Sequence, residues 1–287
     1  MNKNILHNRD LLLKEEGLND TYLKDVKIFK TTKYEPKSPL IYNVSLLLVL
    51  QGKKIANLAN TSITFDCDNY LVVPTTLPLE CETYASVDEP FICLIISLDR
   101  KIMYEIIELL EKREFENSKN NSIGIFSDKV TLELEKTTSR LLDILESKEK
   151  SLVLGNSILK ELFYHIAIGE NANFLHKMFL ENNSEAKIAR ALKTIHDNYK
   201  ENIDIPSLAR KEDMSVSSFH THFKNITSHT PLQYIKKIKL TKAKDLLSKY
   251  NYKVVETAYE LGYDNPSQFS RDFKNYFGYS PKEAKSL

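Results

Sequence analysis

Two stretches of thirteen residues in the C-terminal third of the chain, fifty residues apart, share two phenylalanines, a Lys-Asn pair and a final proline at matching positions. The letters FHTHFKNITSHTP at 219–231 match FSRDFKNYFGYSP at 269–281. Ahead of each copy lies a short segment that contains an alanine, Ala209 or Ala258. Two helices that cross at a tight turn need such a small residue where their backbones approach. The repeat therefore predicts two helix-turn-helix units in series.

The second helix of each unit has one apolar and one polar face. At about 100° per residue, Val216, Phe219 and Phe223 share a side in the first copy, as do Phe269 and Phe273 in the second, and we expect them to face the core. The opposite faces carry small or hydrogen-bonding side chains, which suit a helix that enters the major groove of DNA. These are Ser217, Ser218, Thr221 and Asn225 in the first copy and Ser267, Gln268, Arg271 and Asn275 in the second.

Arg271 is the strongest single candidate for reading a base. Its guanidinium can bind O6 and N7 of a guanine in a bidentate manner, and Gln268 can bind adenine in the same way. Lys224 and Lys274 stand near the ends of the two second helices, where they suit phosphate contacts that position a protein without reading sequence. The second unit is therefore expected to contribute more specificity than the first.

The segment from Pro231 to Lys249 joins the two units. It has a proline in its first turn and no internal glycine, so it is predicted to form one helix of about 28 Å. A rigid spacer of that length can hold two reading helices about 34 Å apart, which is one turn of DNA. Both helices could then enter successive major grooves on one side of a duplex.

Charge is divided unevenly along the chain. Residues 184–287 hold 18 lysines and arginines against 12 acidic residues, whereas residues 1–183 hold 22 against 27. A basic segment attached to an acidic one is typical of a nucleic-acid module with a separate control domain, although a solvated charged surface gives the same asymmetry.

The N-terminal half changes from strand to helix patterns. Short apolar and β-branched runs between turn residues predict strands, the first at 40–50 before a turn at 51–54. From Arg100 the period becomes helical, with a polar hinge at about 148–150 between two helices. The predicted fold is α+β. Residues 1–180 form a regulatory domain with a small antiparallel β-barrel at about 39–99 and helices at about 100–170, residues 181–187 form a linker, and residues 188–287 form an all-α domain of two helix-turn-helix units joined by a long helix.

The closing segment, AYELGYDNPSQFSRDFKNYFGYSP, resembles the signature of the AraC/XylS family of bacterial regulators, and the likeness covers about 185–287. The resemblance implies a seven-helix DNA-binding domain, asymmetric promoter sites and activation through contacts with RNA polymerase. The segment from about Pro39 to Met103 is similar to the N-terminal domain of one AraC-type subgroup. That similarity implies a cupin-like barrel, dimerisation helices and, in many relatives, a small-molecule effector inside the barrel.

The resemblance assigns residues within the repeat. It places Ser217, Ser218, Thr221, Ser267, Gln268 and Arg271 on base edges. The set expected on DNA phosphates is Lys224, Asn225, Lys239, Lys274 and Asn275. The first unit departs from the family pattern, with Asp213 in place of a common turn glycine and 228–230 in place of Gly-x-Ser, while Lys239 replaces a usual arginine. Direct reading by the first unit is therefore expected to be weak.

An enzyme is the main alternative for the N-terminal half. A cupin-type enzyme needs histidine and carboxylate ligands inside its barrel, and no histidine lies between His7 and His165. Cys67, Cys81 and Cys93 are odd in number and widely spaced, which favours buried free thiols over a disulfide framework or a metal site. Nucleotide-binding and hydrolase motifs are absent from the sequence. We therefore expect no catalysis, cofactor or metal.

Three functions remain open from sequence. The first is a regulator controlled by an effector, the second is a constitutive regulator whose barrel only dimerises, and the third is an enzyme fused to a DNA-binding tail. No signal peptide or membrane span is apparent, so we expect a cytoplasmic protein. The expected partners are double-stranded promoter DNA, RNA polymerase, an effector of unknown binding site and a second copy of the chain. A stripe of Val130, Leu134, Leu141 and Leu145 is a candidate dimer surface, although core packing explains it equally well.

Overall fold

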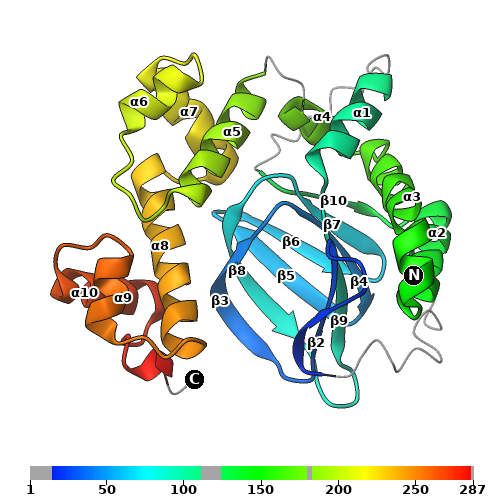
Figure 1. Ribbon diagram of the computed structural model, residues 1–287, viewed down its shortest axis with the longest axis horizontal. Coiled ribbons are helices and arrows are strands. Elements are labelled where there is room, and N and C mark those ends of the chain that lie inside the picture. Colours follow the sequence, from blue (N-terminus) through cyan, green and yellow to red (C-terminus); the bar gives the residue numbers. More distant parts are fainter. Residues whose placement is uncertain (1–14, 111–123, 180–182, 286–287) are drawn as a thin grey trace.

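The computed structural model describes residues 15–110, 124–179 and 183–285. A domain of β-strands lies in the middle, with helices α1–α4 on one side and helices α5–α10 on the other (Figure 1). The strands are β1 Gly17–Asp20, β2 Val26–Thr31, β3 Glu35–Tyr42, β4 Ser45–Gln51, β5 Lys53–Leu58, β6 Thr61–Asp66, β7 Asn69–Val73, β8 Leu77–Tyr84, β9 Phe91–Ser97 and β10 Phe126–Lys129. We call these strands the β-domain.

Two antiparallel sheets make up the β-domain. The larger sheet has the order β1-β2-β9-β4-β7-β10 and the smaller has the order β3-β8-β5-β6. Strand β5 alternates between buried and less buried residues because only its inner face meets the core. Strand β4 is buried at six successive residues from Ser45 to Leu50, since the larger sheet is covered on both faces. The expected antiparallel β-fold is thus confirmed, as two facing open sheets rather than one closed barrel.

The strand boundaries differ from the predicted ones. Three strands, β1, β2 and β10, lie wholly outside the predicted 39–99, and β3 begins before it. The run from Leu40 to Leu50 reads as one strand but is broken after Tyr42. The predicted turn at 51–54 is shorter than expected, because Gly52 alone adopts a positive φ of 80° and β5 begins at Lys53.

The helices that follow the strands are α1 Arg100–Leu110, α2 Leu132–Leu145, α3 Lys148–Ala167 and α4 Asn173–Phe179. Residues 148–150, predicted as a hinge, form the first turn of α3, whose N-cap is Ser147. Of the two explanations left open for the α2 stripe, the burial of its leucines supports core packing. Leu134, Leu141 and Leu145 are each at most 1% exposed, because α2 packs this face against α3 and the protein's own core.

The C-terminal part contains α5 Ser184–Asp197, α6 Ile205–Lys211, α7 Val216–Thr227, α8 Pro231–Ser248, α9 Val254–Glu260 and α10 Pro266–Phe277. Helix α5 includes the last four residues of the predicted linker, and 180–182 lie outside the described residues. Helix α8 is the predicted connecting helix; it begins at a proline and has a complete capping box at Thr230. Within the described residues, no helix is long and apolar enough to cross a bilayer.

The molecule has two hydrophobic cores, and the boundary between them lies on α8 rather than at the predicted linker. The larger core includes the β-domain, helices α1–α4 and the first helix-turn-helix unit, and it ends on α8 at Ile238. The second core begins on the same helix at Leu240 and belongs to the second unit. The first unit therefore shares its core with the regulatory half, whereas the second unit has a core of its own.

Candidate DNA-binding surface

The first helix-turn-helix unit consists of α6 and α7. Both helices are capped by side chains, since Asp204 accepts a hydrogen bond from the backbone of Ser207 and Ser215 accepts one from Ser218. Ala209 is fully buried where α6 meets the turn, as its predicted role requires. Asp213, which replaces a common turn glycine, has a φ of 50°, so the turn keeps a left-handed residue without glycine.

The core face of α7 differs from the prediction at one residue. Phe219 and Phe223 are fully buried, and Ile226 continues their stripe at 3% exposure. Val216 was expected in this stripe but is 42% exposed. It is the first residue of α7, and side chains in a helix lean toward the N-terminus, so its side chain extends past the packed part of the helix.

The polar face of α7 is open to solvent. Ser217, Thr221, Lys224 and Asn225 are exposed, and Ser218 is half-buried. The Thr221 hydroxyl donates to the Ser217 carbonyl oxygen at 3.0 Å, which holds the hydroxyl close to the helix backbone. Apart from Lys224, this face thus carries short polar side chains that stay close to the helix.

The second unit consists of α9 and α10. Asn265 caps α10 by accepting hydrogen bonds from the backbone amides of Ser267 and Gln268. Phe269 and Phe273 are fully buried, as is Ala258 of α9. The opposite face of α10 is exposed, and its residues are Ser267, Gln268, Arg271, Lys274 and Asn275.

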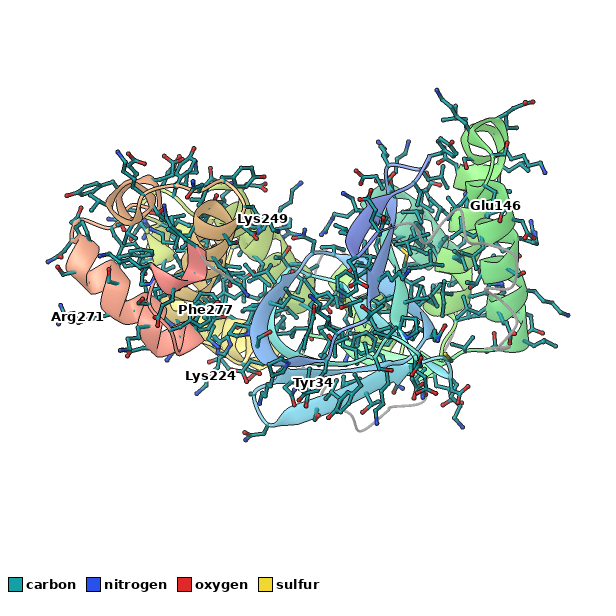
Figure 2. All side chains as sticks on the ribbon, turned by 90° about the horizontal axis from the view of Figure 1, so that it is seen from below. Tyr34, Glu146, Lys224, Lys249, Arg271 and Phe277 are labelled. Carbon is teal, nitrogen blue, oxygen red and sulfur yellow. The ribbon has the colours of Figure 1, made fainter. Side chains whose placement is uncertain are left out.

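Figure 2 shows Arg271 at the end of the molecule farthest from α2 and α3, directed away from the β-domain. Its guanidinium has no hydrogen bond or ion pair within the described chain, so it is free to bind a ligand. Its neighbour Asp272 is instead held to α8 by an ion pair with Lys236 at 2.6 Å. The acidic residue of α10 therefore faces inward while the basic residue faces outward, which leaves a positive surface on the exposed side.

Lys239 differs from the other residues expected on phosphates. It is half-buried on α8, and a Cβ added to Gly262 would lie 3.2 Å from its Nζ. Burial lowers the pKa of its ammonium, while Asp264 opposes that effect. The structure therefore places Lys239 behind the turn of the second unit, whereas Lys224, Asn225, Lys274 and Asn275 are exposed on the reading helices.

The loop ahead of the first unit also touches the second unit, which the sequence did not reveal. The loop after α5 meets the second unit through an ion pair between Lys200 and Glu260. A Cβ at Gly262 would lie only 2.5 Å from the Lys200 carbonyl oxygen, so this close approach requires glycine. Tyr199 packs against both cores. The relative placement of the units is thus fixed at two places, by α8 and by this contact.

A further contact joins the DNA-binding part to the β-domain. Tyr234 of α8 is fully buried and donates its hydroxyl to the Thr76 carbonyl oxygen at 2.7 Å. Its ring packs edge-on against Phe223 of the first reading helix, with 5.4 Å between ring centroids. Gly124 lies so close to the Ile226 carbonyl oxygen that a Cβ there would be 2.4 Å away. The first unit is therefore docked on the β-domain.

Ionisable side chains surround this contact. Burial, assisted by the nearby Lys237 ammonium, lowers the pKa of His229 to about 4. Lys237 is also half-buried, and desolvation lowers its pKa, while the Glu80 carboxylate on β8 opposes the effect. The boundary between the two halves thus holds a histidine that stays neutral at ordinary pH.

The three cysteines of the N-terminal half lie in or next to the β-domain. Cys81 and Cys93 are buried free thiols, as expected, whereas Cys67 is half-buried. Burial raises the pKa of the Cys81 thiol to about 11 and that of Cys93 to about 12, so neither is a reactive thiolate. In the described ranges, no group of three or more histidine, cysteine, aspartate or glutamate side chains is placed to hold a metal ion.

Two family models match the chain. A model for the N-terminus of AraC-type transcriptional regulators matches residues 22–174, and a helix-turn-helix domain model matches residues 208–286. The transcriptional activator RhaS of Mannheimia succiniciproducens is 26% identical over 153 residues, which cover 53% of this chain and 57% of that protein. RhaS of Salmonella paratyphi B is 28% identical over 103 residues, which cover 36% of this chain and 37% of that protein.

Solved structures show the same fold over nearly the whole chain. An apo variant of ToxT from Vibrio cholerae covers 95% of this chain and 99% of its own, with a TM-score of 0.60 at 12% identity. A ToxT structure with a bound unsaturated fatty acid covers 94% of this chain and 96% of its own, with a TM-score of 0.53 at 13% identity. At this identity the likeness establishes the arrangement of the strands and helices.

Proposed function

Because the chain belongs to the AraC-type transcriptional regulators, we propose that it is a sequence-specific DNA-binding activator controlled by a small molecule bound in the N-terminal domain. Promoter DNA and RNA polymerase are its partners in this proposal. The observation that carries it is the pair of exposed polar faces on α7 and α10, held at opposite ends of α8. In this proposal the site residues bind DNA and have no catalytic role.

In this proposal, base edges are contacted by Ser217, Ser218, Thr221, Ser267, Gln268 and Arg271. Phosphates are contacted by Lys224, Asn225, Lys274 and Asn275. Lys239 acts indirectly, because its place behind Gly262 supports the turn that orients α10. Specificity comes mainly from α10, since Gln268 and Arg271 are the long side chains with several hydrogen-bonding atoms, whereas α7 offers hydroxyls held near its backbone.

In this proposal, a conformational change on effector binding in the β-domain is transmitted to the reading helices through the first unit. This unit shares a core with the β-domain, and Tyr234 links α8 to the β7–β8 loop through Thr76. A ligand that shifts this loop by differential binding would change the placement of α8 and so of both reading helices. This contact favours an effector-controlled regulator over a constitutive one. A β-domain that served only for dimerisation would not require a contact with the first unit.

A homodimer is part of the proposal. Two copies of the chain would double the number of reading helices on the DNA. With the α2 stripe buried, the exposed apolar side chains of α3 offer a surface instead, since Leu152 and Val153 are 66% and 71% exposed.

Selection of duplexes from a random pool by the purified chain tests the proposed function. We expect an enriched sequence with two half-sites about one helical turn apart. Binding to it should exceed binding to a scrambled duplex by about a thousandfold or more at physiological salt. A failure to enrich any sequence, with equal affinity for all duplexes, would contradict a sequence-specific regulator.

A further inference from the structure

An open hollow lies on the surface of the β-domain, where the connections β2–β3, β4–β5, β6–β7 and β8–β9 meet. Its volume is about 520 Å³, which fits a small organic molecule. Gly52 on its wall lies directly against the buried Phe91, since a Cβ there would be 3.1 Å from the Phe91 Cα atom. Packed core rather than further cavity therefore lies behind this wall, and a ligand here stays outside the interior.

Two tyrosine rings form the aromatic part of the wall. Tyr34 and Tyr84 lie edge to face, with 5.7 Å between their ring centres. Tyr34 is 53% exposed, and Figure 2 shows it at the surface of the β-domain. Its hydroxyl donates to the Glu82 carboxylate, and hydrogen bonding to Glu82 raises the pKa of both tyrosines. The phenols therefore stay neutral and offer their rings to the hollow.

The Tyr84 ring already carries an ammonium group of the chain itself. The Lys53 Nζ lies over this ring, 4.6 Å from its centre. The electron-rich face of an aromatic ring attracts ammonium groups, quaternary ones included. Lys53 is exposed, and among the described residues its ammonium makes no ion pair. The ring is thus a place where an ammonium is stable, and Lys53 can leave it without breaking an ion pair.

Carboxylates outnumber ammonium groups around the hollow. The walls carry Asp66, Asp68 and Glu89 against Lys53, which leaves an excess of two negative charges. Asp66 uses only Oδ1 for the turn, where it accepts from the amides of Asp68 and Asn69 at 2.9 and 3.0 Å. Within the described chain, its Oδ2 and the Glu89 carboxylate make no hydrogen bond or ion pair. The hollow therefore attracts cations and repels anions.

The spacing of these carboxylates favours an organic cation over a metal ion. A metal ion needs several ligand atoms at about 2.0–2.6 Å, and in the part of the chain that the structure describes no three acidic, histidine or cysteine side chains are placed to supply them. An organic ammonium spreads its charge over the neighbouring carbon atoms, which pack on ring faces. Separate carboxylates and two rings thus fit an amine better than a metal.

The hollow adjoins a strand that supports the DNA-binding part. Strand β3 begins directly after Tyr34, and helices α8 and α10 both lie against this strand. The strand is also tied to its neighbour β8 by an ion pair between Lys37 and Glu80 at 3.0 Å. A ligand that binds one position of Tyr34 better than another would therefore act on the support of both reading helices.

We propose that the β-domain binds a small organic ammonium compound in this hollow. The ammonium of the ligand takes the place of the Lys53 Nζ on the Tyr84 ring, and Asp66 and Glu89 supply the opposite charge. Lys53 competes with the ligand, so it lowers the affinity. The inference rests on the proposed function, because it gives the chemical class of the effector.

Isothermal titration calorimetry with named probes tests the proposal. Choline is compared with dimethylbutanol, in which a carbon atom replaces the nitrogen, and putrescine with butanediol, in which hydroxyls replace both amines. We expect the wild type to bind at least one of the two cations about tenfold more tightly than its uncharged analogue, or better. Magnesium chloride should give no saturable heat, because the carboxylates do not converge on one point.

Three variants should change the affinity for that cation in different directions. Lys53→Met should bind about threefold more tightly or better, because a competing ammonium is gone and the charge excess grows. Tyr84→Leu should bind about tenfold more weakly and Glu89→Gln about threefold more weakly. The controls Lys101→Met and Tyr259→Leu, at exposed positions outside the hollow, should bind as the wild type does.

Four results would overturn the inference. They are no saturable binding of either cation up to about 10 mM, equal binding of the uncharged analogues, unchanged or weaker binding by Lys53→Met, and unchanged binding by Glu89→Gln. Glu89 is exposed in a turn, so this last result stands even if Tyr84→Leu does not fold.

Affinity for the selected duplex is measured with the same samples. Specific DNA binding without binding of either cation rejects only the ligand class. Binding of a cation without specific DNA binding rejects the proposed function and leaves the hollow as a ligand site.

Discussion

Gly262 is the residue on which the contact between the second unit and the loop after α5 depends. Its φ is 70°, and its Cα faces the Lys200 carbonyl oxygen so closely that a Cβ would be 2.5 Å from that atom. A backbone oxygen cannot move aside as the end of a long side chain can. The position of the second unit therefore depends on Gly262 having no side chain.

Replacing Gly262 with alanine should be more harmful than the same change at Gly278. Both residues have positive φ, but nothing lies within 4 Å of a Cβ at Gly278, so alanine there carries only the backbone cost of about 1 kcal/mol. Gly262→Ala adds the clash and should cost roughly 2–4 kcal/mol. Urea unfolding of both variants measures the difference. Equal losses would show that the contact with Lys200 is not required.

Arg271 and Lys274 lie on the same exposed face of α10 but have different expected roles. Arg271→Ala should weaken binding to the selected duplex by roughly 1–3 kcal/mol and affect random DNA much less. Lys274→Ala should weaken both alike, since phosphates carry no sequence information. Titration of each variant with both duplexes tests this. Similar losses on both DNAs for Arg271→Ala would contradict its role in base reading.

At the scale of elements, α8 has two roles that its sequence shows only in part. The proline, the lack of glycine and the apolar spacing predicted a single helix between the units, and this is confirmed. Its burial against the β-domain was not predicted, because Tyr234 fits equally well in the core of the first unit. A pattern within one segment shows that a face is buried, but not which distant partner covers it.

The hydroxyl of Tyr234 gives a direct test of that partner. Tyr234→Phe keeps the ring against Phe223 but leaves the Thr76 carbonyl oxygen without this donor. We expect a loss of about 1–2 kcal/mol in the free energy of unfolding. Tyr259→Phe, at a tyrosine that is 58% exposed, should have no effect. If both variants unfold alike in urea, the hydroxyl bond does not hold α8 to the β-domain.

The strands were harder to predict than the helices for a physical reason. The repeat at a fixed offset located α7 and α10 well, because Phe219 and Phe269 occupy matching core positions. Strand β2 carries two lysines, and the two lysines at the start of β5 led to the prediction of a turn there. The exposed residues of the reading helices could be listed from periodicity alone, whereas the position of Lys239 depends on its contact with the distant turn at Gly262.

On the scale of the whole molecule, the boundary between the halves should respond to acid. The pKa of His229 is about 4 in the folded chain and about 6.5 when unfolded, so unfolding takes up a proton between these values. The stabilisation is complete above about pH 6.5 and is lost as the pH falls toward 4. Burial is the main cause of the lowered pKa, Lys237 adds to it, and Glu80 opposes it.

Urea unfolding of wild type and His229→Gln measures this effect. Wild type should lose about 1 kcal/mol more than the variant between about pH 6.5 and pH 5, after allowance for the partial exposure of the ring. Parallel pH profiles for the two proteins would exclude His229 as the group responsible.

The most direct test of the whole arrangement changes the distance between the two half-sites of the selected duplex. If α8 and the Lys200 contact hold α7 and α10 in fixed positions, an insertion of about five base pairs turns one half-site to the opposite side of the DNA. We expect affinity for that duplex to fall about thirtyfold or more, to nearly the level of random DNA, while the same insertion outside the half-sites has no effect. Unchanged affinity after the central insertion would contradict a rigid pair of reading helices.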